Sequence, residues 1–276
     1  MTTANELESA SRIANSTIKQ IKERGTCSRE EIRFLVDAYY QVQKMRIALG
    51  NQIFALTESN EPHEISDWLF SQFKLIESQI SRSLKAFCET TKPGQWLLSI
   101  TGIGPVLAAN FLAHLDVTKS ETAGGFWRFA GLDPTLEWKK GCKRPFNARL
   151  KTACWKAGES FCKVQNRDSD VYGKVYAERK ALEIQRNDRL EFADQAKEKL
   201  EKFNIGKDTD AYKHYAEGKL PPAHIDQRAK RYAVKLFLSH LHHVMYECEH
   251  GRKPPKPYVI EHMGHAHYVA PPNWPL

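Results

Sequence analysis

The stretch Ser99–Leu115, SITGIGPVLAANFLAHL, places Gly102, Ile103 and Gly104 between two apolar runs. Glycine lacks a Cβ, so it allows a positive φ or a close approach of the backbone to another group. The following residue, Pro105, suits the first position of a helix because its missing N–H would have no partner there. The pattern predicts two helices joined by a tight glycine turn, which is a helix-hairpin-helix element.

A glycine turn of this kind can hold a phosphate group. It presents backbone N–H groups beside the positive end of the second helix, where a phosphate oxygen can bind. We therefore predict that Gly102, Ile103 and Gly104 hold nucleic-acid phosphate through their amides. The alternative is that the two glycines only let the helices pack closely.

The charge of the chain favours a polyanionic partner. The chain has 276 residues, with 41 Lys and Arg against 33 Asp and Glu and a net charge of +8. Between Lys139 and Lys163, eight basic residues face Glu159 alone, which is a local net charge of +7. Such an excess is expected to attract phosphate. The predicted contacts in this segment are Lys139, Lys140, Lys143, Arg144, Arg149 and Lys156.

A second basic group lies near the end of the chain, and the first basic segment contains aromatic residues between its cations. Arg228, Arg231 and Lys235 share one face of an amphipathic helix at spacings of three and four, and we predict that they also face phosphate. Aromatic side chains such as Trp138 and Trp155 can stack on unpaired bases or fill a core. For Trp155 we expect a place in the core.

The pattern of the whole chain predicts a mainly α fold in five parts. Residues 1–27 are polar and expected to be flexible. Residues 28–92 begin with a capping box at Ser28 and carry apolar residues at spacings of three and four, interrupted by Arg46, which is typical of a coiled-coil hairpin arm. The arm is expected to form a homo-oligomer. The remaining parts are a helix-hairpin-helix domain (93–166), an exposed, charged helical excursion (167–222), and a basic helix with an irregular Pro- and His-rich tail (223–276).

The tail raises the question of a metal. His262, His265 and His267, with Cys248 or His250, can converge on one zinc ion, although their spacing is not that of a common zinc module. The other interpretation is that these side chains are hydrogen-bonded or stacked, so no cofactor is assigned. The six cysteines form no Cys-x-x-Cys pair and the N-terminus lacks a signal peptide, which predicts a cytoplasmic protein. No apolar run is long enough to cross a bilayer, so no membrane partner is expected.

Three sequence motifs resemble a known family. SITGIGPVLAANFLAHLD, then FWRFAGLDP, then a basic stretch and an Asn147-x-x-Leu150-Lys151 helix start are similar to the C-terminal transposase domain of the bridge-RNA-guided insertion-sequence transposases, the group of the Piv and MooV invertases. The likeness covers about Trp96 to Phe161, and the preceding hairpin is similar to the coiled-coil arm of that family. It implies a role in DNA recombination by a mobile element.

Two departures from the family alter the expected activity. Family members begin with a RuvC-like domain whose acidic residues bind metal, whereas this chain starts with the arm, so we expect that metal centre to be absent. The family also carries a catalytic serine soon after the proline of its Gly-Leu-x-Pro motif, whereas TLEWKKG follows Pro134 here. The resemblance thus implies a transposase-like protein without either half of the family's active site.

Three hypotheses follow. The first is a transposase-like protein that binds DNA or structured RNA by its phosphates without cutting it. The second is an active recombinase whose catalytic residue is unknown, with Ser160 or Thr135 as the nucleophile or a RuvC-like nuclease partner in trans. The third is a structural protein whose arm builds an oligomer.

Overall fold

The computed structural model describes residue 19, residues 27–255 and residues 269–276. The expected flexible N-terminus lies almost entirely outside these residues. The described part is helical and has no strand, as the mainly α prediction requires. The helices, in chain order, are α2 (Arg29–Glu58), α3 (Glu64–Glu89), α4 (Lys92–Ser99), α5 (Pro105–His114), the 3-10 turn η1 (Val117–Lys119), α6 (Ala123–Phe129), α7 (Ala148–Val164), α8 (Tyr172–Asp188), α9 (Ala193–Lys202), α10 (Asp210–Ala216) and α11 (Pro222–His250).

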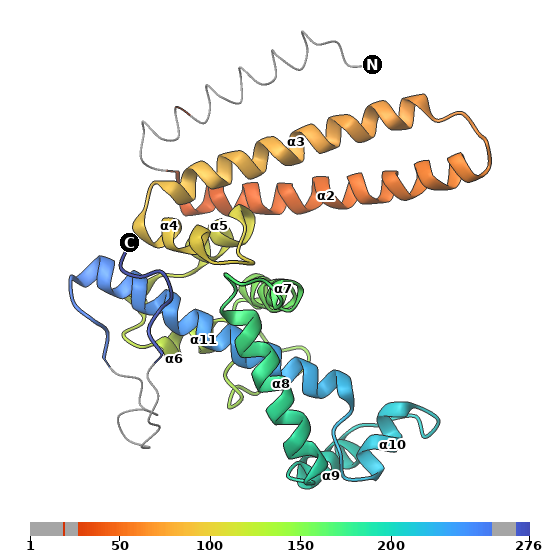
Figure 1. Ribbon diagram of the computed structural model, residues 1–276, viewed down its shortest axis with the longest axis vertical. Helices are drawn as coiled ribbons and strands as arrows, with labels where there is room; N and C mark the ends of the chain where they lie inside the picture. Colours follow the sequence, from red (N-terminus) through yellow and green to blue (C-terminus); the bar gives the residue numbers. More distant parts are fainter. Residues whose placement is uncertain (1–18, 20–26, 256–268) are drawn as a thin grey trace.

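Helices α2 and α3 form the predicted antiparallel arm, which projects from the body of the molecule (Figure 1). The N-cap half of the predicted capping box is confirmed at Ser28, whose side chain accepts a hydrogen bond from the backbone N–H of Glu31. Arg46, which interrupts the apolar pattern of α2, pairs with Glu77 on α3. An ion pair between the two helices therefore replaces an apolar contact at that point.

Only the base of the arm is fully buried. Ile32 and Leu84 are 1% and 0% exposed, and they lie in the main core. Toward the far end of the arm, two helices alone cannot enclose a core, and large apolar side chains such as Phe54 and Ile65 are 68% and 82% exposed. The expectation that the arm forms a homo-oligomer stays a prediction.

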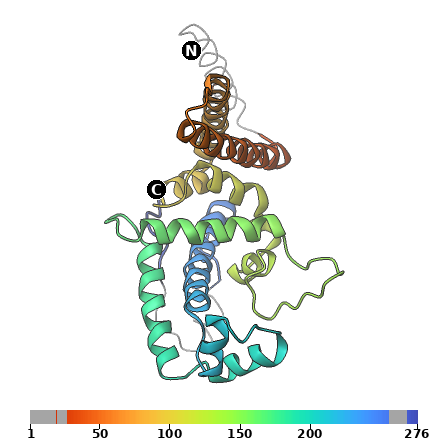
Figure 2. The ribbon, with the colours of Figure 1, turned by 90° about the vertical axis from the view of Figure 1, so that its right-hand side faces the viewer.

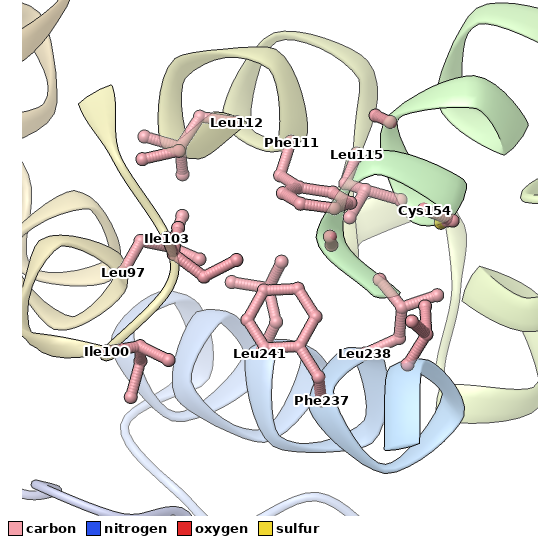
Figure 3. Close-up of a cluster of buried hydrophobic side chains, with 14 of the residues drawn as sticks. Leu97, Ile100, Ile103, Phe111, Leu112, Leu115, Cys154, Phe237, Leu238 and Leu241 are labelled. Atoms are coloured by element: carbon pink, nitrogen blue, oxygen red, sulfur yellow. The ribbon is translucent and has the colours of Figure 1, made fainter. Parts of the chain in front are cut away.

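The core of the body surrounds α11. Phe237 lies at its centre, and the rings of Trp96, Phe111, Phe161 and Tyr172 lie within 5.2–6.1 Å of it, one each from α4, α5, α7 and α8. Figure 3 shows Phe237, Leu238 and Leu241 pointing from α11 toward Phe111 on α5. Burial of these large rings stabilises the body, because each removes a large apolar area from water.

Helix α8 differs from the exposed excursion that the charged sequence suggested. It packs along α11, as both views show (Figures 1 and 2), and its Tyr172 is fully buried. Two of its charged side chains, Lys180 and Glu183, pair with Asp226 and Arg228 on α11, which lets a polar helix join the core. Beyond it, α9, α10 and the start of α11 enclose a small second cluster of Phe192, Ala196, Leu220 and Ile225.

The end of the chain is irregular, as predicted, but it packs on the body. Trp96 Nε1 donates a hydrogen bond to the carbonyl oxygen of Pro272 (2.7 Å), and Trp274 Nε1 donates one to Glu247 (2.6 Å). The segment therefore links α4 to α11. Among the described residues, no helix is long and apolar enough to cross a membrane.

Candidate nucleic-acid interface

The glycine turn joins α4 to α5 as the sequence predicted. The chain leaves α4 at Ser99, and the N–H of Ile103 donates to the carbonyl oxygen of Ile100 (2.9 Å) to close the turn. The side chain of Ile103 is 4% exposed and points into the core, as Figure 3 shows. Its amide already has a partner, so Ile103 has a structural role and not the predicted phosphate contact.

Gly102 is required by packing. Its φ is +94°, and a Cβ at this position would lie 3.2 Å from Val164 Cγ2 and 3.3 Å from Phe161 Cδ1. The Ser160 hydroxyl on α7 donates to its carbonyl oxygen (2.6 Å). For this glycine the packing alternative explains the residue, because its φ strains any other residue and a Cβ would require Val164 and Phe161 to shift.

Gly104 differs from Gly102 in every one of these respects. It is exposed, it is the N-cap of α5, and a Cβ there would meet nothing within 4 Å. No side chain caps the helix, so the N–H groups of Gly104, Val106 and Leu107 have no partner among the described residues. Three free donors at a positive helix end suit an anion. The phosphate hypothesis therefore applies to Gly104 and the first turn of α5.

The two glycines give a test that separates packing from binding. Gly102→Ala should lower the free energy of unfolding by at least about 1–2 kcal/mol, since a left-handed conformation is costly for alanine. Gly104→Ala should leave a cooperative melt almost unchanged and weaken nucleic-acid binding about tenfold, which corresponds to about 1.4 kcal/mol. Melting and binding are measured on the same sample. A Gly104→Ala protein that binds like the parent removes the turn from the interface.

The basic loop, residues 138–144, is an exposed turn between α6 and α7. Cys142 N–H donates to the Lys139 carbonyl oxygen (3.1 Å), and Trp138 Nε1 donates to the Cys142 carbonyl oxygen (2.8 Å), so the tryptophan closes the loop. Arg144 lies 5.4 Å from the centre of the Trp138 ring. Lys139, Lys140 and Lys143 are exposed and have no acidic partner in the part of the chain that the structure describes. These lysines are free to meet phosphate.

Asn147 anchors the loop to α7. Its side chain accepts hydrogen bonds from the N–H groups of Arg149 and Leu150, both at 3.0 Å, which caps the helix as the sequence suggested. Its own N–H donates to the Phe129 carbonyl oxygen (2.9 Å). Its side-chain amide also contacts His114 (3.2 Å), a buried histidine whose pKa is lowered to about 4 by burial. The base of the loop is thus held by the core.

Arg149 and Lys156 face the arm. Arg149 pairs with Asp37 on α2 at 2.7 Å, and the Lys156 ammonium lies 2.9 Å from the centre of the Tyr40 ring. Burial lowers the pKa of Lys156. Both side chains therefore tie α7 to α2, and neither is a free cation like the lysines of the loop.

The basic residues of α11 have separate roles. Arg228 donates to Glu183 on α8 (2.9 Å) and to Gln195 on α9 (3.1 Å), so it is a structural residue and not the predicted phosphate contact. Arg231 is exposed. The Lys235 ammonium lies 4.7 Å from the centre of the Trp127 ring.

Asp133, in the segment that leads into the basic loop, lies within electrostatic range of Lys235 on α11. Hydrogen bonds from Thr135 lower the pKa of Asp133, and the charges of Arg128 and Lys235 lower it further. The second basic group is thus reduced to Arg231 and Lys235. Lys235 lies beside the segment that leads into the loop.

The two candidate phosphate sites lie at opposite ends of α7. Gly102 packs against Ser160 near the end of this helix, whereas the basic loop precedes its first turn at Asn147. At 1.5 Å per residue the separation along the helix is about 20 Å. The turn and the basic loop therefore lie too far apart to contact the same phosphate.

The weak catalytic candidates have other partners. The Ser160 hydroxyl is bonded to Gly102, as described above, and the Thr135 hydroxyl donates to Asp133 (2.7 Å) within a short turn. No base contacts the Ser160 hydroxyl among the described residues, whereas a serine nucleophile needs one. The Asp133 carboxylate does contact the Thr135 hydroxyl, and it also accepts the N–H of Thr135 (2.9 Å), so this contact closes the short turn. The geometry gives Ser160 a structural role, and it gives Thr135 a turn-closing contact with a carboxylate.

Only two of the five proposed zinc ligands lie among the described residues. His262, His265 and His267 lie outside the described residues. Cys248 and His250 are exposed near the end of α11, and within residues 27–255 and 269–276 no three His, Cys, Asp or Glu side chains form a group that could hold a metal ion. The zinc interpretation stays a prediction.

One aromatic residue differs from its expected place. Trp155, expected in the core, is 55% exposed on the outer face of α7, whereas the buried face carries Leu150, Cys154, Ala157 and Phe161 as predicted. Helical periodicity already places Trp155 opposite Leu150 and Phe161. The expectation of a buried Trp155 was therefore wrong, and the helical period of α7 is the feature that indicates its exposure.

The glycine turn and the basic loop lie within a region that matches a known family model. Residues 94–162 match the family model described as Transposase IS116/IS110/IS902 family. The match runs from α4 to α7 and includes the glycine turn, the basic loop and Trp155. It supports a transposase domain and a transposase-like function, as the resemblance over Trp96 to Phe161 implied. No curated protein and no solved structure matches the chain.

Proposed function

We propose that this chain holds nucleic acid by its phosphate backbone, as a transposase-like protein of the bridge-RNA-guided group. The basic loop is the observation that carries this proposal. Lys139, Lys140 and Lys143 are exposed without acidic partners on a loop that Trp138 holds in shape. Cations gathered in this way repel one another, and a polyanion relieves the repulsion while releasing its counterions.

The first turn of α5 adds a second contact. Its free N–H groups at Gly104, Val106 and Leu107 act in the manner of a helix-hairpin-helix element. In a duplex, the phosphates of one strand are spaced about 3.4 Å apart along the helix axis. A segment of about six nucleotides therefore spans the distance of about 20 Å between the two ends of α7. Contacts of this kind position the nucleic acid without reading its sequence.

We further propose that the chain by itself holds the strand and does not cut it. The hydroxyl groups of Ser160 and Thr135 both donate to oxygen atoms within the fold. An active recombinase with a nuclease partner in trans is the competing hypothesis, and the transposase match is compatible with it.

Salt dependence and strand cleavage test the proposal together. About four phosphate contacts on duplex DNA should give a slope of about −3.6 in a plot of log affinity against log salt concentration. A flat slope, or no binding at low salt, contradicts the proposal. Supercoiled plasmid incubated with the protein and Mg²⁺ or Mn²⁺ should stay closed. Nicking that disappears in Ser160→Ala or Thr135→Ala would instead identify a recombinase.

A further inference from the structure

Trp155 has no structural explanation within the described part of the fold. Its side chain is 55% exposed, and its indole makes no hydrogen bond, ring contact or cation contact with a described residue. It is also not among the residues packed against the core, unlike Trp127 on α6. A single exposed apolar residue is ordinary. What distinguishes Trp155 is the surface on which it lies.

On the described face of α7 around Trp155, positive charge is exposed and the one carboxylate is paired. Lys151 is exposed one helical turn before Trp155 on the same side of α7. Glu159, one turn after Trp155, pairs with Lys230 on α11 at 2.7 Å. Glu159 is the only carboxylate of the segment from Lys139 to Lys163, and its ion pair with Lys230, which also pairs with Asp226, reduces its repulsion of a phosphate near the ring of Trp155.

Further aromatic rings pair with cations between Trp155 and the basic loop. The Lys151 ammonium lies 4.4 Å from the centre of the Phe146 ring, and Arg144 lies 5.4 Å from that of Trp138. Trp138 is 43% exposed, and its hydrogen bond to Cys142 holds the plane of the ring. Rings and cations thus alternate from the loop onto α7.

We infer that this surface binds strands with unpaired bases, which stack on Trp155 and Trp138 while the neighbouring cations hold the phosphates. The inference rests on the proposed function and names its substrate class. Cations alone serve duplex and single strands alike, but in a duplex the faces of the bases are covered by their neighbours. Exposed tryptophans add affinity only where a base offers its own face. A purely apolar partner would leave the cations between the rings without a counter-charge.

The test compares a single strand with a duplex. Probes are fluorescein-labelled oligothymidylate of about 20 nucleotides, its oligouridylate counterpart, and a duplex of the same length. Trp155→Leu keeps an apolar side chain but removes the aromatic face, and Trp155→Phe keeps a smaller face. Trp68 on α3 is 50% exposed and lies on the arm, so Trp68→Leu is the matched control.

Anisotropy titrations should show about tenfold weaker binding of both single strands by Trp155→Leu, within the range for loss of one stacked base. Trp155→Phe should recover part of the loss, whereas duplex binding and the Trp68→Leu protein should be unchanged. Equal losses on oligothymidylate and oligouridylate mean that the base face is read regardless of the sugar, and a loss on one alone assigns the surface to DNA or to RNA.

Two results overturn the inference without touching the proposed function. One is a parent protein that binds duplex and single strands while Trp155→Leu leaves both affinities unchanged. The other is an equal loss on duplex and single strands, which would assign Trp155 a contact with the backbone. A parent protein that binds none of the probes instead contradicts the proposed function itself. Melting curves of each variant confirm that the fold is retained.

Discussion

Replacing Lys139, Lys140, Lys143 and Arg144 together with alanine should weaken nucleic-acid binding by about 100-fold or more near 0.1 M salt, to the same degree on every sequence. Each phosphate contact releases condensed counterions, so removal of four should also reduce the salt slope on duplex DNA by about 3.6. The fold should persist, because the three lysines are exposed and without ion-pair partners in the described part of the chain, and Arg144 contacts only the Trp138 ring.

A control of equal charge separates local contact from general attraction. Lys44 and Lys74 on the arm and Lys197 and Lys207 near α9 are exposed and remote in sequence from the basic loop. Their combined replacement with alanine lowers the net charge by the same amount. Similar losses of affinity in both quadruple variants, measured by titration at several salt concentrations, would show that no particular loop holds the phosphates.

The largest effect on stability is expected at Glu183 of α8. This carboxylate is 1% exposed, and it accepts hydrogen bonds from Arg228 on α11 (2.9 Å) and from Arg179 on α8 (2.7 Å). Burial opposes its ionisation, but the hydrogen bonds from these arginines outweigh burial and hold the pKa of Glu183 below its ordinary value. Glu183→Gln leaves the arginines without their counter-charge, and breaking a buried ion pair in this way costs about 3–5 kcal/mol.

Urea denaturation of Glu183→Gln beside Glu178→Gln measures this effect. Glu178 is exposed on the same helix and should change the free energy of unfolding by less than about 0.5 kcal/mol. Because the pKa of Glu183 is lowered in the fold, its contribution is present above the ordinary pKa and lost as the pH falls through the folded value. The variant should therefore lose stability less steeply in acid than the parent. A melt like that of the parent would mean that α8 is held by its apolar contacts alone.

Local sequence patterns predict much of the fold. Ser28 and Asn147 are helix caps that the sequence already indicates, and the apolar spacing of α7 predicts its buried face from Leu150 to Phe161. These features depend on neighbours within one or two turns, which is the range over which helical periodicity acts. The turn between α4 and α5 is predictable for the same reason, as is the positive charge of the segment that follows it.

Local sequence patterns do not predict which partner each polar group finds. Arg228 and Lys140 are both basic residues on a helix or loop, yet Arg228 is bonded to Glu183, far from it along the chain, and Lys140 has no such partner among the described residues. Arg149 likewise finds Asp37 on the arm. A spacing of three or four residues shows that side chains share a face. It does not show which other helix covers that face.

By itself, the sequence determined the helices, their caps, the glycine turn and the local excess of positive charge. Only the tertiary structure decided that Gly102 serves packing while Gly104 stays open, and that Trp155 lies outside the core. The physical reason is the distance along the chain over which each kind of interaction acts. Backbone conformation and periodicity depend on residues nearby in the chain, whereas exposure and ion pairing depend on contacts such as those of α7 with α2, α5 and α11, which bring together residues distant in sequence.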